Sequence, residues 1–411
     1  MKYFDELETR SPETRERTQF KSLQDQIANA KKNAPFFTRL LVNVQPYEVK
    51  DRAALAKLPV VRKSDLIALQ QQELPFAGMT TRDLSRLGRV FASPGPIYDP
   101  QGDKKDYWGI GRALYAAGFR EGDLVHNAFS YHFTPAGFMF DLGAQSIGCV
   151  VFPAGVGQTE LQVQTIADLK PAAYAGTPSF LKILLEKADE MKLDIRSFRK
   201  ASVSGEAFLP PQRKFFAERG IDTYQTYGTA DLGLIAYETD AREGLVVDEG
   251  VIVEIVCPGT GDPVPDGEVG EVVVSTFASE YPLIRFATGD MSAVLAGISP
   301  CGRTNLRIKG WMGRADQTTK VRGMFVHPSQ IAEVVKRHKE VLRARLVVTH
   351  DSERSDQMTL QCEVNGIPDG LSQALNESLR DLCKVRGTVE FRAPGTLSND
   401  GKVIDDQRKY E

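Results

Sequence analysis

Between residues 104 and 203 the chain alternates between helix-like and strand-like segments, and this pattern constrains the fold more than any other feature. The helix-like segments have apolar residues at helical spacing, whereas the segments between them are short apolar runs. The predicted elements are, in order, a helix at 104–118, a strand at 146–153, a helix at 159–169, a strand at 172–175, a helix at 178–191 and a strand at 200–203. Strands that alternate with helices of this length are typical of a parallel sheet. The sequence therefore predicts an α/β fold.

The part of the chain that follows has valine-rich strands divided by turns rich in glycine and proline. Two such strands are expected at 246–256 and 270–276. This pattern favours an antiparallel β-sheet or a β-barrel in this part of the chain. Residues 314–411 then alternate between strands and helices in a pattern that indicates a small α+β module. We therefore expect a large N-terminal domain, residues 1–313, with parallel or mixed sheets and a barrel-like part, and a small C-terminal domain, residues 314–411.

Length, charge and cysteine content limit the classes of protein to which the chain can belong. A chain of 411 residues is too long for one core. Its net charge of −3 gives no reason to expect nucleic acid or an anionic membrane as a partner. No apolar run approaches the ~20 residues of a membrane span, and the acidic N-terminus is not typical of a signal peptide. The five scattered cysteines indicate free thiols and a reducing compartment, so we expect a cytoplasmic protein.

The segment 224–233 combines groups that suit a nucleotide and a cation. We expect Gly228 to adopt a positive φ in a sharp turn that ends a strand. Thr229 would then offer a hydroxyl and an N–H to a phosphate, and Asp231 a carboxylate to a hard cation. Tyr227 has a flat face on which a base can stack. The alternative is an ordinary strand-to-loop turn with no ligand.

Several short motifs occur in an order that resembles the adenylate-forming superfamily. The motifs are Ser204-Gly-Glu206, Tyr227-Gly-Thr-Ala-Asp231, Thr288-Gly-Asp290, Gly313-Arg314-Ala-Asp316, Gly323 and Gly401-Lys402. Within that superfamily the chain is most similar to phenylacetate–coenzyme A ligases, from about residue 55 to the C-terminus. Each motif is weak by itself, but their common order supports the fold that the family has.

The resemblance implies a binding site for the adenosine part of ATP. Asp290 matches the aspartate that accepts hydrogen bonds from both ribose hydroxyls, and Arg314 matches an arginine that also reaches the ribose. Gly205 and Glu206 match the segment that packs against adenine, and Tyr227 matches the residue that stacks on it. The alternative for Asp290 is an aspartate that caps a turn, and the alternative for Arg314 is a surface salt bridge. The alternative for Tyr227 is a core tyrosine.

The resemblance also implies the catalytic groups and the hinge. Thr229 and Asp231 lie in the catalytic motif, and Asp231 occupies the position of the glutamate that binds Mg²⁺ in the family. Lys402 matches the lysine that neutralises charge on the attacking carboxylate and the α-phosphate. Asp316 matches the hinge about which the C-terminal domain rotates between half-reactions. The alternatives are a solvated tail lysine for Lys402 and an ordinary turn aspartate for Asp316.

The phosphate-binding loop departs from the family pattern. The family has a loop rich in serine, threonine and glycine that contains a lysine, whereas residues 88–100 of this chain are expected to form a short strand that leads into a loop with several prolines. Only Ser93 and Gly95 remain as candidate phosphate ligands. Pro94 and Pro96 remove backbone N–H donors that would bind pyrophosphate, and Asp99 adds a negative charge. The loop therefore raises the question of whether triphosphate is still bound.

A second departure concerns zinc. Relatives often have a Cys-Pro-Cys-Gly-Arg-Thr-His segment, but this chain has one thiol there, Cys301, and no imidazole. Cys257 and Cys301 together are too few for a closed zinc site. We expect both to be free cysteines.

The acyl pocket is expected in the segment 127–138 and at 154–155. The candidate residues are Tyr131, His132, Phe133, Gly137 and Gly155. In this hypothesis the glycines leave room, the aromatic ring of Phe133 forms an apolar wall, and Tyr131 and His132 meet a polar group. Such a pocket suits an aromatic or short apolar carboxylic acid. The alternative for His132 is a hydrogen-bonded core histidine.

The leading hypothesis is an acid–thiol ligase with ATP, Mg²⁺ and coenzyme A as cofactors. It would convert a carboxylic acid to an acyl-adenylate and then transfer the acyl group to coenzyme A. The alternative is a non-catalytic family member that binds a nucleotide or acyl ligand as a regulatory or scaffold subunit. The altered loop favours the alternative, whereas Asp290, Arg314 and Lys402 favour the enzyme. A homodimer is left open.

Overall fold

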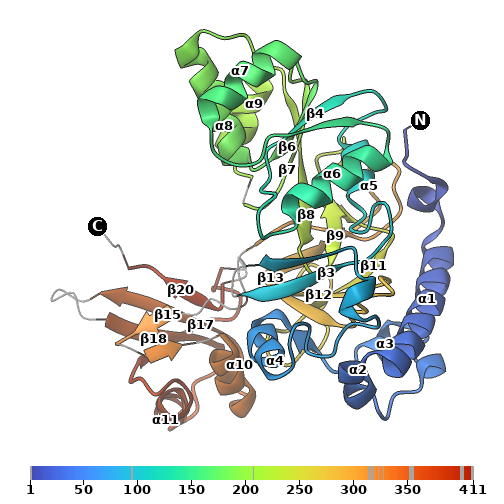
Figure 1. Ribbon diagram of the computed structural model, residues 1–411. Helices are drawn as coiled ribbons and strands as arrows, with labels where there is room; N and C mark the ends of the chain where they lie inside the picture. Colours follow the sequence, from blue (N-terminus) through green and yellow to red (C-terminus); the bar gives the residue numbers. More distant parts are fainter. Residues whose placement is uncertain are drawn as a thin grey trace. The chain divides into compact units, whose positions relative to one another are not determined.

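The computed structural model describes residues 2–93, 96–206, 208–312, 315, 319–322, 324–326, 328–350, 356–398 and 402–408. The chain forms two compact units (Figure 1). Unit 1 consists of Met1–Val253, Val274–Phe286 and Leu295–Gly310, and unit 2 consists of Glu254–Val273, Ala287–Val294 and Trp311–Glu411. The strands β11 (Val251–Val256), β12 (Val269–Thr276) and β13 (Phe286–Leu295) run from one unit into the other along the chain.

Unit 1 contains most of the helices and strands described in the chain. Its α-helices are α1 (Pro12–Asn33), α2 (Pro35–Leu40), α3 (Arg52–Leu55), α4 (Leu66–Gln72), α5 (Ile110–Ala116), α6 (Ala136–Ser146), α7 (Thr159–Leu169), α8 (Pro178–Met191) and α9 (Pro210–Glu218). Its strands are β1 (Val61–Arg62), β2 (Arg89–Ser93), β3 (Ile97–Gln101), β4 (Leu124–Asn127), β5 (Val150–Pro153), β6 (Ala173–Gly176), β7 (Lys200–Val203), β8 (Asp222–Thr229), β9 (Gly233–Tyr237), β10 (Leu245–Val247) and β14 (Arg307–Ile308).

A mixed sheet forms the centre of unit 1. Eight of its strands follow the order β14-β10-β9-β8-β7-β6-β4-β5. The five strands from β8 to β5 along this path pair in parallel, which confirms the predicted parallel sheet. Pairing becomes antiparallel at β9 and β10. The expected α/β fold with an antiparallel continuation is therefore present.

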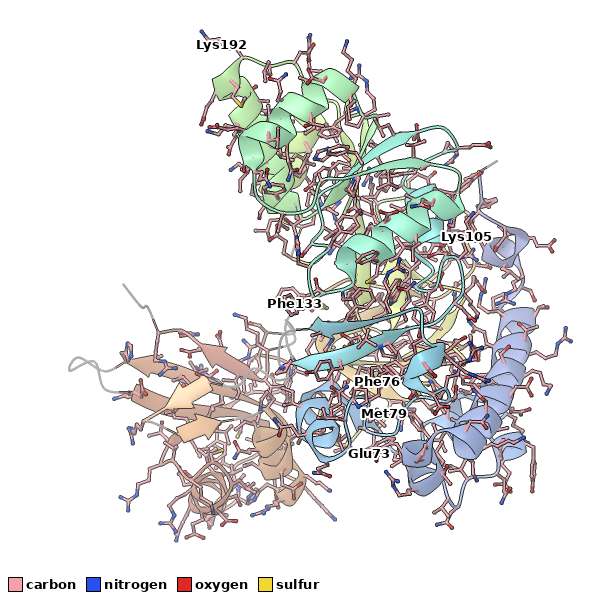
Figure 2. All side chains as sticks on the ribbon, in the orientation of Figure 1. Glu73, Phe76, Met79, Lys105, Phe133 and Lys192 are labelled. Carbon is pink, nitrogen blue, oxygen red and sulfur yellow. The ribbon has the colours of Figure 1, made fainter. Side chains whose placement is uncertain are left out.

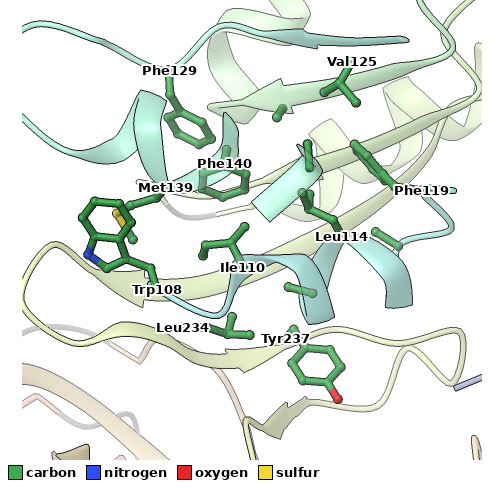
Figure 3. Close-up of a cluster of buried hydrophobic side chains, with 14 of the residues drawn as sticks. Trp108, Ile110, Leu114, Phe119, Val125, Phe129, Met139, Phe140, Leu234 and Tyr237 are labelled. Carbon is green, nitrogen blue, oxygen red and sulfur yellow. The ribbon is translucent and has the colours of Figure 1, made fainter. Parts of the chain in front are cut away.

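Helices cover both faces of the parallel strands. Side chains alternate between the two faces of a strand, and in β6 Ala173 and Ala175 belong to one buried cluster whereas Tyr174 belongs to another. The first cluster lies under α5 and α6, where the rings of Phe129 and Phe140 stack with their centroids 4.3 Å apart (Figure 3). The second lies under α7, α8 and α9, which gather beside β6 and β7 in Figure 1. Burial on both faces explains why these strands are short apolar runs.

The predicted elements of unit 1 are partly correct. The helices α7 and α8 and the strand β7 have the predicted bounds. The helix expected at 104–118 is shorter, and the strand expected at 146–153 is preceded by α6, which the sequence pattern did not indicate. The proline-containing segment after β2 is not a simple loop, because Ile97–Gln101 returns as β3 and pairs antiparallel with β2.

Unit 2 contains a small α+β module, as predicted for the C-terminal part. Its elements are β15 (Thr319–Val321), β16 (Met324–Val326), α10 (Pro328–Arg337), β17 (Val341–His350), β18 (Asp356–Val364), α11 (Leu371–Cys383), β19 (Thr388–Arg392) and β20 (Ile404–Asp406). Four of these strands form a sheet in the order β19-β18-β17-β20. The predicted domain boundary lies between residues 313 and 314, which are outside the described residues, so it stays a prediction.

Among the described residues, no helix combines the length and apolar character that crossing a membrane requires.

Candidate functional site

The candidate residues of unit 1 follow the carboxyl ends of neighbouring parallel strands. Asn127, the last residue of β4, pairs with Pro153 of β5 and Ala175 of β6. Gly176 of β6 pairs with Val203, the last residue of β7. The acyl-pocket segments follow β4 and β5, Gly205 and Glu206 follow β7, and the segment with Thr229 and Asp231 ends β8. In open α/β sheets this edge is where ligands bind.

Asn127 organises the expected acyl-pocket residues at the end of β4. Its side chain is fully buried. The amide Nδ2 donates hydrogen bonds to the hydroxyl of Tyr131 at 2.7 Å and to the carbonyl of Gly137 at 2.8 Å, and the backbone carbonyl accepts one from the N–H of Gly155 at 3.0 Å. The Tyr131 hydroxyl in turn donates to Asp141 Oδ2 at 2.8 Å. Three of the five predicted pocket residues are therefore hydrogen-bonded to one buried asparagine.

The two glycines of the predicted pocket differ in the space beside them. A Cβ on Gly137 would lie 2.8 Å from the ring of Tyr131, so the room beside this glycine is already filled. A Cβ on Gly155 would have no atom within 4 Å, although the φ of +69° at this position favours glycine. The expectation that both glycines leave room for a substrate is therefore wrong for Gly137.

The two neighbouring aromatic residues are exposed. Phe133, labelled in Figure 2, is 82% exposed and has a φ of +59°, which is unusual for a bulky side chain. Its carbonyl accepts a hydrogen bond from the N–H of Ala92 in β2 at 2.9 Å, which ties this segment to the strand before the altered loop. His132 is also exposed, so the alternative of a core histidine is wrong. Their roles in an acyl pocket stay predictions.

Gly205 and Glu206 lie exposed just after β7. Gly205 has a φ of +84°, which glycine adopts without strain. Glu206 Oε1 accepts a hydrogen bond at 2.6 Å from the backbone N–H of Ser179 in the first turn of α8. A carboxylate at this place also interacts favourably with the helix dipole. Both residues are thus held in a defined geometry, and the adenine contact stays a prediction.

The turn after β8 differs from the expected one. Gly228 lies inside β8, where the pairing with β9 shifts register, and its φ is not positive. A Cβ there would lie 2.5 Å from the carbonyl oxygen of Gly233, so glycine is required by the close approach of the two strands. The positive φ, +75°, belongs to Gly233. The turn itself spans residues 230–232, and Thr229 Oγ1 accepts a hydrogen bond from the N–H of Leu232 at 3.2 Å.

Trp108 holds this turn from the loop before α5. Its indole N–H donates to the carbonyl of Ala230 at 3.2 Å, and its carbonyl accepts from the N–H of Leu234 at 2.8 Å. A Cβ on Gly233 would lie 2.6 Å from the carbonyl oxygen of Trp108. Bonds on both sides of Asp231 therefore fix the backbone that presents its carboxylate.

Asp231 is surrounded by charged groups. Its side chain is buried, and the ammonium group of Lys63 contacts Oδ2 at 2.5 Å. Asp99 of β3 lies beside it, fully buried, and accepts a hydrogen bond from the hydroxyl of Ser93 through Oδ2. Burial and the neighbouring Asp231 carboxylate raise the pKa of Asp99 to about 8. Ser93, expected to bind phosphate, is thus engaged by a carboxylate.

The predicted residues of unit 2 are described only in part. The Asp290 carboxylate is largely buried and accepts a hydrogen bond from the indole N–H of Trp311 at 3.2 Å. Lys402 has a half-exposed side chain and an ion pair with Asp405 at 3.0 Å. Arg314 and Asp316, and likewise Pro94 and Gly95 of the loop in unit 1, lie outside the described residues. The roles of all these residues stay predictions.

All five cysteines are free, as expected. Cys301 is buried and accepts a hydrogen bond from the Arg303 guanidinium at 3.6 Å, and Cys257 is partly buried. In the described part of the chain, no group of three or more histidine, cysteine, aspartate or glutamate side chains is arranged to hold a metal ion.

Sequence reasoning assigned no role to several residues that build the site. Lys63 is in none of the motifs given above, and Asp99 is interpreted from the sequence only as an unfavourable charge. Trp108 and Asn127 were not singled out. One signal was available: the chain has only two tryptophans, and each donates its indole N–H to a candidate motif. The pairing of Asp99 with Asp231 has no local signal, because different strands bring the two residues together.

Comparisons with known proteins agree with this arrangement. Residues 110–278 match the family described as AMP-binding enzyme. A phenylacetate–coenzyme A ligase of Aromatoleum evansii is 30% identical over 84% of this chain and 81% of its own length, and one of Thermus thermophilus is 30% identical over 89% and 85%. A crystal structure of 2-hydroxyisobutyryl-CoA ligase in the postadenylation state has a TM-score of 0.75 and 25% identity, with coverage of 99% of this chain and 93% of that one.

Proposed function

Because this chain belongs to the phenylacetate–coenzyme A ligase family of adenylate-forming enzymes, we propose that it activates an aromatic or short apolar carboxylic acid. In the first half-reaction the carboxylate attacks the α-phosphate of ATP, which gives an acyl-adenylate and releases pyrophosphate. In the second, the thiol of coenzyme A attacks the acyl carbon, which gives a thioester and releases AMP. The relatives favour this ligase over a non-catalytic family member.

The observation that supports the proposal best is the gathering of four motif segments at one edge of the parallel sheet. The segments that contain Tyr131, Gly155, Glu206 and Asp231 all follow the carboxyl ends of β4, β5, β7 and β8. This edge is the usual ligand site of open α/β sheets. It therefore provides one place for an acid next to a nucleotide.

The residues at this edge suit the positioning of both substrates. Tyr227 is partly exposed at the end of β8, where its ring can stack on a base. The exposed Phe133 and the open space beside Gly155 suit an apolar acyl group. Two residues of unit 2 have the remaining proposed roles: Asp290 would bind the ribose hydroxyls, and Lys402 would neutralise charge that develops during adenylation. Fixing the reactants in line lowers the barrier without covalent participation of the protein.

Asp231 fits a magnesium ion. Its Oδ1 is buried and accepts no hydrogen bond from any described N–H or hydroxyl group, so this oxygen is available to a cation when the neighbouring Asp99 is ionised. Carboxylate oxygens are preferred ligands of this cation. A magnesium ion bound with ATP would neutralise negative charge on the phosphates.

A division of the reaction between two conformations is part of the proposal. The 2-hydroxyisobutyryl-CoA ligase has been solved in a postadenylation state and in a thioesterification state with coenzyme A, and this chain resembles both, with TM-scores of 0.75 and 0.73. A rotation about Asp316 would let the C-terminal domain serve both half-reactions. A homodimer and a cytoplasmic location are also proposals, the latter supported by the five scattered cysteines.

The proposal is tested by measuring pyrophosphate release with ATP and Mg²⁺ across a panel of acids. The panel contains phenylacetate, benzoate, isobutyrate and 2-hydroxyisobutyrate, with a long-chain fatty acid and a dicarboxylic acid as contrasts. We expect release with an aromatic or short apolar acid and a thioester when coenzyme A is added. Turnover of only the long-chain or dicarboxylic acid would contradict the proposed substrate class, and no turnover of any acid would contradict the proposed activity.

A further inference from the structure

Three buried polar groups near the turn after β8 have no hydrogen-bond partner among the described residues when the two carboxylates among them are ionised. They are Asp99 Oδ1, Asp231 Oδ1 and the hydroxyl of Tyr281. Asp99 is 0% exposed, Tyr281 is 1% exposed, and the side chain of Asp231 is also 0% exposed. Most buried polar atoms in proteins are hydrogen-bonded, so several unsatisfied atoms in one place indicate a missing ion or water. The two carboxylates and the phenol interact electrostatically with one another.

The satisfied oxygens of the two carboxylates show how the pair is held. Asp99 Oδ2 accepts from the Ser93 hydroxyl, and Asp231 Oδ2 contacts the Lys63 ammonium. These contacts leave one oxygen of each carboxylate for a further ligand. Below its raised pKa of about 8, Asp99 is protonated and hydrogen-bonds to the Asp231 carboxylate. In mildly alkaline solution both carboxylates are ionised, and with the Lys63 ammonium group the charges sum to −1. A buried net charge is costly unless another charge compensates it, so the pair favours a cation over a neutral molecule.

We propose that Asp99 and Asp231 together bind a hard divalent cation, Mg²⁺ in the reaction. Proteins usually hold this ion with one or two carboxylates, substrate phosphate oxygens and water. Asp99 Oδ1 and Asp231 Oδ1 supply the two carboxylate ligands, and a bound water would accept the hydrogen bond of the Tyr281 hydroxyl. The identity of the phosphate ligand rests on the proposed use of ATP, whereas the two protein ligands do not depend on it.

A cation bound by both carboxylates explains two departures from the family pattern, namely Asp231 in place of a glutamate and the extra negative charge of Asp99. Asp231 is one methylene shorter than the glutamate that the resemblance implies, and a second carboxylate compensates for its shorter reach. Asp99 lies on β3, which returns from the altered loop and pairs with β2. The negative charge that this segment brings to the site is then a metal ligand and not a residue that repels phosphate.

The test uses Mn²⁺ as the probe, with the full chain in mildly alkaline buffer and free Mn²⁺ followed by electron paramagnetic resonance. Titrations are done without nucleotide and with α,β-methylene-ATP, which cannot release pyrophosphate. The variants are Asp99→Asn and Asp231→Asn, which keep the shape of the side chain and remove its charge. The matched control is Asp123→Asn, because Asp123 also pairs with a lysine, Lys200, at 2.8 Å, but at the amino-terminal ends of β4 and β7.

We expect Asp99→Asn and Asp231→Asn each to weaken Mn²⁺ binding at least ~10-fold, the loss expected when one of two charged ligands is removed. Asp123→Asn should bind as the wild type does. Unchanged Mn²⁺ affinity in Asp99→Asn, or no binding by the wild type under either condition, would overturn the assignment. Thermal unfolding without metal shows whether each variant is folded, and Asp99→Glu, which restores the charge, should recover part of the affinity if the protein is folded.

The outcome is separate from that of the proposed function. A wild type that binds Mn²⁺ through both carboxylates but releases no pyrophosphate would leave this assignment in place and contradict the ligase activity. Pyrophosphate release together with unchanged Mn²⁺ affinity in Asp99→Asn would do the reverse.

Discussion

Glu8 joins the N-terminal segment to the rest of unit 1 through charges buried in the interior. It is 1% exposed, and its carboxylate contacts Arg303 at 3.1 Å, Arg112 at 3.3 Å and the hydroxyl of Tyr237 at 2.9 Å. Arg112 has two further carboxylate partners, Asp5 and Asp248. The Arg303 guanidinium, in contrast, has Glu8 as its described carboxylate partner and is itself 3% exposed. The loss of Glu8 would therefore leave Arg303 with an uncompensated buried charge.

We expect Glu8→Ala to lower the free energy of unfolding by ~3 kcal/mol or more, because removal of one partner from a buried ion pair costs about 3–5 kcal/mol. Urea denaturation of the variant and the wild type measures this difference. Glu6→Ala is the control, because Glu6 lies two residues before Glu8 in the same 3-10 helix and is exposed. A loss below ~1 kcal/mol for Glu8→Ala would show that solvent reaches this network.

Lys402 allows a second prediction at this scale, which concerns the adenylation barrier. A lysine that interacts only with the transition state should affect the rate and not the affinity for AMP. We expect Lys402→Ala to slow acid-dependent pyrophosphate release by at least ~100-fold and to change AMP affinity by less than ~2-fold. Thioester formation from a preformed acyl-adenylate should be much less affected. Equal pyrophosphate release in variant and wild type would show that Lys402 is a solvated tail lysine.

Single residues were predictable where a local motif defines them, and not where the fold pairs them. The motif order indicated Glu206, Asp231 and Asp290 because each lies in a short segment with a recognisable pattern. Asp99 could not be interpreted in the same way, because its environment depends on β3 folding back against β2 and approaching the end of β8. Its surroundings come from tertiary structure, and no spacing in the sequence contains them.

The turn that presents Asp231 depends on a contact between elements. The Trp108 indole donates to the carbonyl of Ala230, and its ring packs in the cluster that also contains Met139 and Leu234 (Figure 3). Trp108→Phe keeps most of the apolar contact but removes the hydrogen bond. We expect the free energy of unfolding to fall by ~1 kcal/mol, the usual net value of one hydrogen bond. We also expect kcat to fall, because the turn would no longer hold the Asp231 carboxylate in place.

The comparison that tests this prediction uses kcat for pyrophosphate release and thermal unfolding of the same samples. A misplaced carboxylate should lower kcat by ~10-fold or more. Trp311→Phe, in unit 2, is the matched control, because its indole donates to Asp290, which is proposed to bind ribose. That variant should mainly raise KM for ATP. Unchanged kcat in Trp108→Phe would show that the turn holds its shape without this bond.

Helices and strands are predictable from the sequence where their apolar residues recur at a regular spacing. The bounds of α7 and α8 follow from their apolar periodicity and the punctuation at their ends. α6 was missed because two glycines, Gly137 and Gly143, lower its intrinsic helix propensity. Both are needed for packing: a Cβ on Gly143 would lie 2.7 Å from the Ile110 side chain of α5. Tertiary packing overrides local preference here, and a single sequence does not reveal that.

At the scale of the whole molecule, the two units are not contiguous in sequence. Unit 2 includes Glu254–Val273 and Ala287–Val294 in addition to the C-terminal part. Sequence patterns can indicate a single boundary such as 313/314, but they do not show that a unit is made of several separate segments of the chain. The proposed rotation about Asp316 belongs to this scale, because it would let the C-terminal domain bring Lys402 to the first half-reaction and admit coenzyme A in the second.

The hinge assignment of Asp316 gives the prediction that belongs to this scale. Proline fixes φ near −65° and lacks an N–H, so Asp316→Pro should hinder rotation about this residue and leave each half-reaction site chemically intact. We expect pyrophosphate release within ~3-fold of the wild type and thioester formation slowed by at least ~10-fold, because only the second half-reaction requires the rotation. Single-turnover experiments separate the two steps, since the acyl-adenylate can be allowed to form before coenzyme A is added.

Asp316→Ala is the control for the side chain itself, because alanine removes the carboxylate but leaves the backbone free to rotate. If both variants lose thioester formation equally, the carboxylate and not the rotation is required. If Asp316→Pro loses both half-reactions, the substitution has disturbed the adenylation arrangement, and the hinge must be placed elsewhere in the segment. Only a loss that is confined to the second step and to the proline variant supports rotation about Asp316, because it alone connects backbone freedom at this position with the transfer to coenzyme A.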